Sequence, residues 1–284
     1  GGNTFNGSTT ITNSGSDEFV LGNGNADIFN NTVTFNNTGS YRIRAAYNHS
    51  GQTTTFNGNV TLNSNKSGGT DSWSFLFGEV NDSNLLFNGL LTINCGGTLR
   101  SDHRFLNGTG SAGSFNGPIT INITNTHPST VVTMGVNGTA TYAENIILSN
   151  SGGANGVVFN NSTSASSTLA AGKTITVGAG GFSSGSLSLQ RFVQTSATNQ
   201  TLALTGTSSL TLGPDSQFGG DVSFSSPRLF MNGCTYGGTT TLTKNGAGDD
   251  GGTGGNIFQG VTTITNAGSG YLLTGNVNAD QFNG

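Results

Sequence analysis

The chain has 284 residues, of which 32% are hydrophobic and 8% charged, with 47 glycines, 18 phenylalanines and a net charge of −4. Nine Lys and Arg residues spread over the chain form no basic patch, which excludes a nucleic-acid partner, and no apolar run reaches the ~18–20 residues of a membrane-inserted helix. Disordered chains usually combine few aromatic residues with high net charge, so this composition favours an ordered core.

The first predicted element follows the tripeptide Phe5-Asn6-Gly7, and this motif or a close variant returns along the whole chain. Its copies begin at Phe5, Phe29, Phe56, Phe87, Phe115, Phe159, Phe258 and Phe282, so that successive copies differ in residue number by 24, 27, 31, 28, 44, 99 and 24. Weaker copies at Phe218 and Tyr236 fall within the widest gap. The spacing therefore indicates an internal repeat.

The segments that follow the motif alternate apolar and polar residues, are rich in β-branched residues and are bounded by Gly or Asn. In chain order they include residues 59–63, 90–94, 118–122 and 239–243, and pairs such as Ile175 and Val177 or Leu210 and Leu212 show the same alternation. This pattern is typical of β-strands. No sustained helical period occurs, so the sequence predicts an all-β fold.

A period of about 24–31 residues with two or three short strands fits one coil of a right-handed parallel β-helix, also called a β-solenoid. About eleven coils at ~4.8 Å each would make a rod of roughly 50 Å. We expect Gly to supply positive φ angles at the corners. We expect the motif Phe residues to stack in the core and the following Asn residues to form a corner ladder. The predicted stack contains Phe5, Phe29, Phe56, Phe87, Phe115, Phe159, Phe258 and Phe282, and the predicted ladder contains Asn6, Asn30, Asn57, Asn88, Asn116, Asn160 and Asn283.

A much longer repeat encloses these coils. Residues 1–31 align without a gap to residues 254–284, at an offset of 253, with 19 of the 31 positions identical. The sequence therefore predicts that residues 1–253 form one solenoid unit and that residues 254–284 begin the next. We expect the chain to be an excerpt or processed product of a protein with several tandem units.

The phrases at residues 4–13, 168–178 and 270–280 resemble those of very long repetitive surface proteins of Bacteroidota. The resemblance covers most of the chain. It implies a secreted adhesin or fibre at the cell surface, exported by type IX secretion, and it brings no catalytic motif with it.

Many parallel β-helices are polysaccharide lyases or hydrolases, which need clustered acid and base groups. The densest mixed trio is Asp102-His103-Arg104. Neighbouring residues of a strand point to opposite faces, so we expect these three residues to lie in a surface loop without catalytic function.

Two patterns are similar to calcium loops. Asn23, Asn25 and Asp27 alternate like the first ligands of such a loop, and Asn276, Asn278 and Asp280 repeat them. Both lack the later Gly and Glu, so corner hydrogen bonding is the favoured interpretation and a weak structural cation the alternative. Asp249-Asp250 lies in a glycine-rich stretch, for which a flexible loop is favoured over a calcium site.

The remaining candidates are isolated residues. His49, His103 and His127 show no metal-ligand spacing. Trp73, near Tyr41 in coil terms, is either a packing residue or a sugar-stacking platform. Cys95 and Cys234 should lie too far apart for a disulfide. Thr9, Thr61, Thr92 and Thr120 would form an outward threonine array if they lie in a row.

The sequence as a whole predicts a non-enzymatic, extracellular structural or adhesive segment. We expect no catalytic, cofactor-binding or metal site, and no cofactor. The expected partners are neighbouring tandem units of the same chain and surface glycans, with no nucleic acid and no membrane insertion. Two alternatives stay open, a polysaccharide-acting β-helix enzyme and an ice-binding solenoid.

Overall fold

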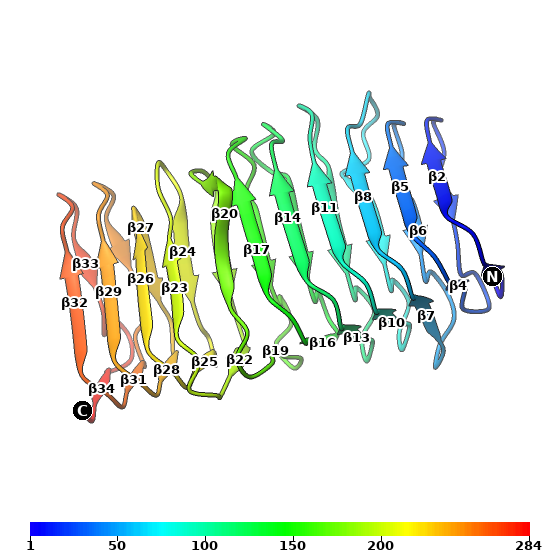
Figure 1. Cartoon of the computed structure of the whole chain (residues 1–284). Coiled ribbons are helices and arrows are strands. Elements are labelled where there is room, and N and C mark those ends of the chain that lie inside the picture. The colour runs from blue at the N-terminus through cyan, green and yellow to red at the C-terminus, as the bar shows by residue number, and fades with distance from the viewer.

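The computed structural model describes all residues from Gly1 to Gly284 as a rod of stacked coils made only of strands. The coils follow one another from the N-terminus at one end to the C-terminus at the other (Figure 1). Strands of successive coils pair in parallel. The predicted all-β class and parallel β-solenoid are therefore confirmed. No helix is present that is long and apolar enough to cross a membrane.

Three long sheets run along the rod, and each of the first seven coils contributes one strand to each of them. Sheet A contains β1 (Thr4–Phe5), β4 (Ile28–Phe29), β7 (Thr53–Phe56), β10 (Asn84–Phe87), β13 (Ala112–Phe115), β16 (Thr139–Tyr142), β19 (Ser167–Leu169), β22 (Phe192–Gln194), β25 (Gln217–Phe218), β28 (Thr235–Tyr236), β31 (Ile257–Phe258) and β34 (Gln281–Phe282). Sheet B contains β2 (Thr9–Asn13), β5 (Val33–Asn37), β8 (Val60–Ser64), β11 (Leu91–Cys95), β14 (Ile119–Ile123), β17 (Ile146–Asn150) and β20 (Ile175–Phe182).

Sheet C contains β3 (Phe19–Val20), β6 (Ile43–Ala45), β9 (Trp73–Phe77), β12 (Asp102–Phe105), β15 (Val131–Met134), β18 (Gly156–Phe159), β21 (Ser186–Leu189), β24 (Ser209–Leu212) and β27 (Arg228–Met231). Toward the C-terminus a four-stranded sheet follows sheet B, made of β23 (Gln200–Ala203), β26 (Val222–Ser226), β29 (Thr240–Lys244) and β32 (Thr262–Asn266). A two-stranded sheet of β30 (Asp250–Gly251) and β33 (Leu272–Leu273) completes the last coils.

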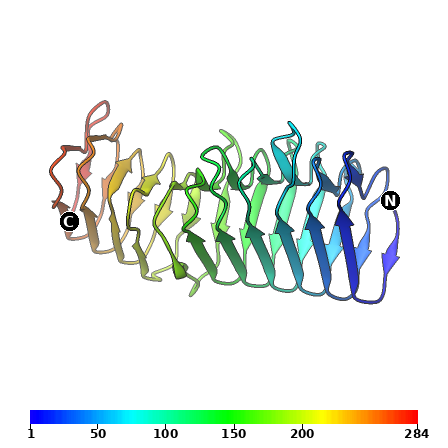
Figure 2. The ribbon, with the colours of Figure 1, turned by 90° about the horizontal axis from the view of Figure 1, so that it is seen from above.

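Seen from above, the strands of sheet B form an even row, and loops of differing size project from the opposite side (Figure 2). Coil length varies because these loops vary. In sheet A a long coil separates the paired residues Phe56 and Phe87, whereas a much shorter one separates the paired residues Phe218 and Tyr236. Several coils therefore have the predicted length, and the shortest coils near the C-terminus fall below the predicted range.

An aromatic column runs along the inside of sheet A. Phe5, Phe29, Phe56, Phe87 and Phe115 stack in order with ring centroids 4.5, 5.0, 4.6 and 5.1 Å apart, and Tyr142 continues the column at 5.2 Å. A second stretch runs from Phe218 through Tyr236 and Phe258 to Phe282. Stacked aromatic pairs add to the free energy gained from burying their area.

The assignment of Phe159 to this column is wrong. Phe159 ends β18 of sheet C and pairs with Met134 and Leu189, while its ring meets Tyr142 edge-on at 5.7 Å. Its motif copy, Phe159-Asn160-Asn161, resembles the others, but it lies at the end of a strand of sheet C, whereas the other copies lie at the ends of strands of sheet A. The same dipeptide serves at both positions because a buried ring followed by a corner amide suits either corner.

Nineteen glycines have the positive φ angles that were predicted, but the glycines of the motif have a different role. Gly58 and Gly89 do not have positive φ angles. They are needed instead because successive coils approach closely at this corner: a Cβ on Gly89 would lie 2.6 Å from the carbonyl oxygen of Gly58. A side chain there would separate neighbouring coils.

Buried polar side chains stabilise the turns between sheets B and C. Asn37 donates hydrogen bonds to the carbonyls of Tyr41 and Ser74, and Asn150 donates to those of Ala154 and Ser184. In a later coil Lys244 replaces the amide and donates to the carbonyls of Gly246 and Gly270. Loop carbonyls that would otherwise lack partners are satisfied in this way.

Candidate functional site

The outward face of sheet B carries a row of threonines. Strand pairing brings Thr10, Thr34, Thr61, Thr92 and Thr120 side by side on consecutive strands. Thr9, which the sequence assigned to this row, pairs with Val33 instead. Because alternate residues of a strand face opposite sides, Thr9 lies on the core-facing side of β2 and Thr10 takes its place.

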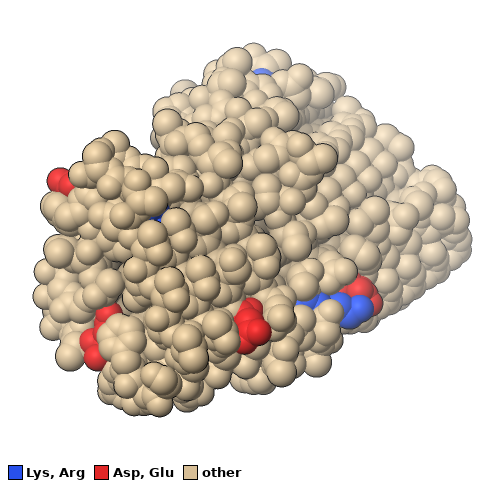
Figure 3. All heavy atoms as spheres, turned by 60° about the vertical axis from the view of Figure 1, so that its left-hand side comes forward, with Lys and Arg blue, Asp and Glu red and all other residues tan.

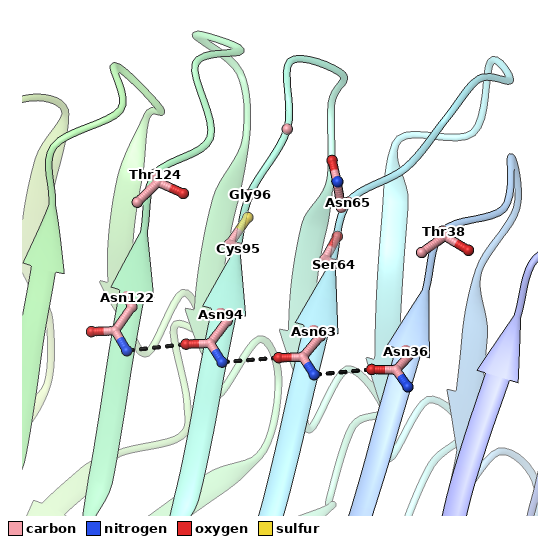
Figure 4. A pocket seen from close by; sticks show the side chains of 11 residues that line it. Asn36, Thr38, Asn63, Ser64, Asn65, Asn94, Cys95, Gly96, Asn122 and Thr124 are labelled. Carbon is pink, nitrogen blue, oxygen red and sulfur yellow. Dashed lines mark hydrogen bonds between the residues drawn. The ribbon is translucent and has the colours of Figure 1, made fainter.

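Two residues further along each strand, asparagines form a second row that the sequence analysis missed. The amide of Asn63 donates to Asn36, Asn94 donates to Asn63, and Asn122 donates to Asn94, each at 2.9 or 3.0 Å (Figure 4). At one end Ser149 donates to Asn122. We call Asn36, Asn63, Asn94 and Asn122 the groove ladder. The repeated phrases Thr61-Leu62-Asn63, Thr92-Ile93-Asn94 and Thr120-Ile121-Asn122 were its signal in the sequence.

The groove ladder lies along one side of a groove of about 470 Å³ that crosses four coils. On the other side Thr38, Asn65 and Thr124 begin the turns that leave sheet B, and Gly96 and Gly97 take the corresponding place in the coil of β11. We call this feature the amide groove. A Cβ on Gly96 would meet no atom closer than 3.4 Å, so the groove is open at this point.

The amide groove contains no ionisable side chain other than the thiol of Cys95. Its lining consists of Asn, Thr, Ser, Gly and that cysteine, and burial raises the pKa of the Cys95 thiol to about 12. Figure 3, which turns the C-terminal end forward, shows a surface on which charged side chains are few and scattered. Hydrogen bonding from neutral groups is therefore the chemistry that this groove offers.

The predicted corner ladder lies between sheets A and B, one corner away from the groove. Side-chain amide bonds of 2.7–2.9 Å join Asn6 to Asn30, Asn30 to Asn57, Asn57 to Asn88 and Asn88 to Asn116. The next coil has Ala143 at this position, so the ladder ends there.

Two residues assigned to the corner ladder are placed differently. Asn160 is buried at the end of β18 with a φ of 61° and donates to the carbonyl of Ala165, so its assignment to the ladder is wrong. Asn283 has the expected position after Phe282, but the equivalent residue of the preceding coil is Gln259 rather than Asn. The backbone N–H of Asn283 donates to the carbonyl of Phe258.

The trio Asp102-His103-Arg104 does not converge on one site. It forms part of β12 rather than the predicted surface loop. Asp102 accepts hydrogen bonds from Arg100 at 2.8 Å and from the backbone of Val131, and burial raises its pKa. His103 is buried 5.1 Å from the Phe75 ring, where burial lowers its pKa to about 4. Arg104 points to the opposite face.

A charged and aromatic cluster occupies the outer face of sheet C near the N-terminus. Arg42 and Arg104 both lie over the ring of Trp73, at 4.6 and 5.2 Å from its centroid. Arg42 also pairs with Asp71 at 3.2 Å and lies over Tyr41. Trp73 is thus held between guanidinium groups of the preceding and following coils, so packing, rather than an open sugar platform, describes its position.

The calcium-like patterns take part in corner hydrogen bonds. Asp27 Oδ1 accepts from the backbone N–H of Asn3 at 2.8 Å and from its side chain at 3.0 Å. Asp280 makes the same pair of bonds to Asn256. Asp250 is buried at the start of β30 and pairs with Arg228 at 2.8 Å, so the prediction of a flexible loop at this residue is wrong. No group of three or more His, Cys, Asp or Glu side chains is close enough to hold a metal ion.

The remaining histidines and Cys234 lie outside the amide groove, and Cys95 is part of its lining. His49 is buried against the Thr54 hydroxyl at 2.9 Å, and desolvation lowers its pKa. His127 accepts a hydrogen bond from the backbone of Ser129 in a turn. Cys95 and Cys234 are both buried free thiols, and burial raises the pKa of Cys234 to about 12.

Comparison with known proteins adds no family assignment. The chain matches no family of known sequences, no curated protein and no solved structure. The function must therefore be argued from the repeat and from the surfaces described above.

Proposed function

We propose that the chain is a segment of a longer, extracellular β-solenoid that serves as the shaft and adhesive surface of a cell-surface fibre. The observation that carries this proposal is that the sequence of residues 1–31 recurs at residues 254–284, together with several of its contacts. The resemblance to Bacteroidota surface proteins and to type IX secretion substrates agrees with it.

The two copies of the coil share their hydrogen bonds as well as their sequence. Asn13 donates to the carbonyl of Asp17 at 2.9 Å, and Asn266 donates to the equivalent Gly270 at 2.7 Å. The paired rings of Phe5 and Phe29 recur as Phe258 and Phe282. A coil that repeats in this detail can be stacked again in the same way.

Burial at equivalent positions shows what neighbouring coils contribute. Phe5 is only half-buried, whereas its equivalent Phe258, which has a preceding coil, is fully buried. Phe282 is 57% exposed, whereas its equivalent Phe29, which is followed by another coil, is 1% exposed. A neighbouring coil on each side is therefore what buries the motif Phe ring fully.

The test is to extend the chain in the register of the repeat, by fusing residues 32–253 directly after Gly284. Residues 32–253 contain eight strands of sheet A, from β7 to β28, so this fusion should add about 38 Å at ~4.8 Å per strand. We expect small-angle scattering and electron microscopy to show one continuous rod about 1.7 times as long as the parent, at ~4.8 Å per strand.

The matched control fuses residues 43–253 instead, which omits β5 and places β6, a strand of sheet C, where a strand of sheet B should follow. This fusion should give two rods joined by a flexible link. If the in-register fusion is also jointed, the tandem-shaft proposal is wrong. The extracellular and adhesive parts are tested separately, by locating the parent protein on intact cells and by measuring its adsorption to glycan-coated surfaces.

Ice binding is a second candidate, and one observation favours it. The outward row of Thr10, Thr34, Thr61, Thr92 and Thr120 places hydroxyl and methyl groups at the regular spacing of parallel strands. The row is interrupted in the next coil by Ile147. Thermal hysteresis that disappears in Thr92→Leu would support this candidate, and its absence in the parent chain would remove it.

A further inference from the structure

We infer that the amide groove binds a neutral polysaccharide whose chain runs along the solenoid axis. This inference rests on the adhesive part of the proposed function, because it names the ligand class and the place where that ligand binds. It does not depend on the number of tandem units.

The groove ladder has hydrogen-bonding capacity to spare. Each side-chain amide has two N–H donors and an oxygen that accepts two hydrogen bonds. In Asn63 and Asn94 one N–H is donated to the preceding coil and the oxygen accepts one bond from the following coil. One donor and one acceptor site therefore remain on each amide, and the half-buried side chains line the groove.

The ladder also fixes the orientation of these groups before any ligand binds. An amide bonded on both sides along the row cannot rotate freely, so little conformational entropy is lost when it bonds to a ligand. Hydroxyl groups of sugars both donate and accept hydrogen bonds. They are therefore suited to a row in which donors and acceptors alternate in fixed directions.

The shape of the groove selects an extended ligand lying along the axis. The groove spans β5, β8, β11 and β14, and equivalent amides recur at the strand spacing of ~4.8 Å. Its volume of about 470 Å³ lies within the usual range for sites of small ligands. A polymer with one hydrogen-bonding unit per step meets the same environment in each coil, so weak contacts add along its length.

The chemistry of the lining selects a neutral polymer. No Lys or Arg lies in the groove to pair with a sugar carboxylate or sulfate. Placing an anion against the groove would therefore cost desolvation without an ion pair in return. The Arg residues of coils two to four lie elsewhere: Arg42 and Arg44 pair with Asp71 and Glu79 at 3.2 Å, and Arg100, in the turn before β12, pairs with Asp102 at 2.8 Å.

The experiment measures binding of neutral oligosaccharides of increasing length by isothermal titration calorimetry. The probes are β-linked glucose and N-acetylglucosamine oligomers and linear α-glucans, and oligogalacturonate serves as the acidic comparison. We expect affinity to rise with length until the oligomer spans the groove, and to be at least ten-fold weaker for the acidic oligomer.

Two variants test the site. Asn94→Ala removes the central amide, and Gly96→Leu places a side chain in the open part of the groove, where a Cβ meets nothing closer than 3.4 Å. Each should weaken binding at least ten-fold. The matched control is Asn88→Ala, which loses two equivalent amide bonds in the same coil but from the corner ladder. It should bind as the parent does.

Several results would overturn the inference: no binding by any neutral oligomer, stronger binding of the acidic oligomer, or equal effects of Asn94→Ala and Asn88→Ala. Self-association lost in Gly96→Leu would assign the groove to a second copy of the chain and would also contradict it. The in-register fusion would still form a continuous rod in any of these cases, so the failure of this inference is distinguishable from failure of the tandem shaft.

Discussion

Removing one ring from the middle of the aromatic column tests how the solenoid is stabilised. Phe87 is 1% exposed and stacks on Phe56 at 4.6 Å and on Phe115 at 5.1 Å. Truncating a buried Phe to Ala costs about 3–5 kcal/mol, and the loss of two stacked partners places Phe87→Ala toward the upper part of this range. We expect the free energy of unfolding to fall by about 4 kcal/mol.

The matched control is Phe282→Ala, because Phe282 is 57% exposed and has one stacked partner, Phe258. It should cost about 1 kcal/mol, in proportion to its smaller buried area. Urea denaturation followed by far-ultraviolet circular dichroism measures both variants. Fluorescence of Trp73, the single tryptophan, reports on the coil that precedes Phe87. Equal costs for the two variants would refute the view that the stacked column carries the stability.

Three further variants test other parts of the coil, each by urea denaturation. Gly89→Ala should destabilise the chain by about 2 kcal/mol or more, because its Cβ would lie 2.6 Å from Gly58, whereas Gly7→Ala, with no atom within 4 Å of the added Cβ, should have little effect. A comparable loss in Gly7→Ala would contradict the close-approach argument. Burial lowers the pKa of His103 to about 4, below its unfolded value of about 6.5. Packing of the neutral ring therefore stabilises the fold fully above about pH 6.5, and this stabilisation is lost as the pH falls toward the folded pKa. Relative to His103→Leu, the parent should lose about 3 kcal/mol more between pH 7 and pH 4, and parallel pH profiles would contradict this. Lys244→Met should cost about 2 kcal/mol because the carbonyls of Gly246 and Gly270 lose their donor, and an unchanged midpoint would show that water replaces it.

The sequence was informative wherever one residue type recurs at one place in the coil. The Phe of the motif and the alternation of the next strand predicted sheets A and B, because buried and exposed residues must alternate on a half-buried strand. The same reasoning reached most of the corner ladder, including Asn57 and Asn88. It also found the long repeat that begins again at Gly254, because aligning the sequence with itself is enough to detect such a repeat.

The sequence was less informative about sheet C and the groove. Phe159 was misplaced because loops of differing length separate the motif from sheet C, so spacing alone does not identify a side of the coil. The groove ladder was visible in the repeated Thr-x-Asn phrases. The groove itself was not, since its shape depends on the turns that contain Asn65, Gly96 and Thr124.

The uniformity of the Phe column and the ladders affects whether the coils stack in their sequence order during folding. A coil that offers Phe and Asn at fixed places can pair equally well with the next coil or with one further along, so these columns permit skipped or exchanged coils. The residue that ends the strand before the turn toward sheet C differs between several coils: it is Asn37, Ser64, Cys95 and Ile123 in four successive coils and Lys244 in a later one. We therefore expect these individual corners to determine which coil pairs with which. A chain given identical corners throughout should assemble into rods of the same cross-section but with mixed coil order.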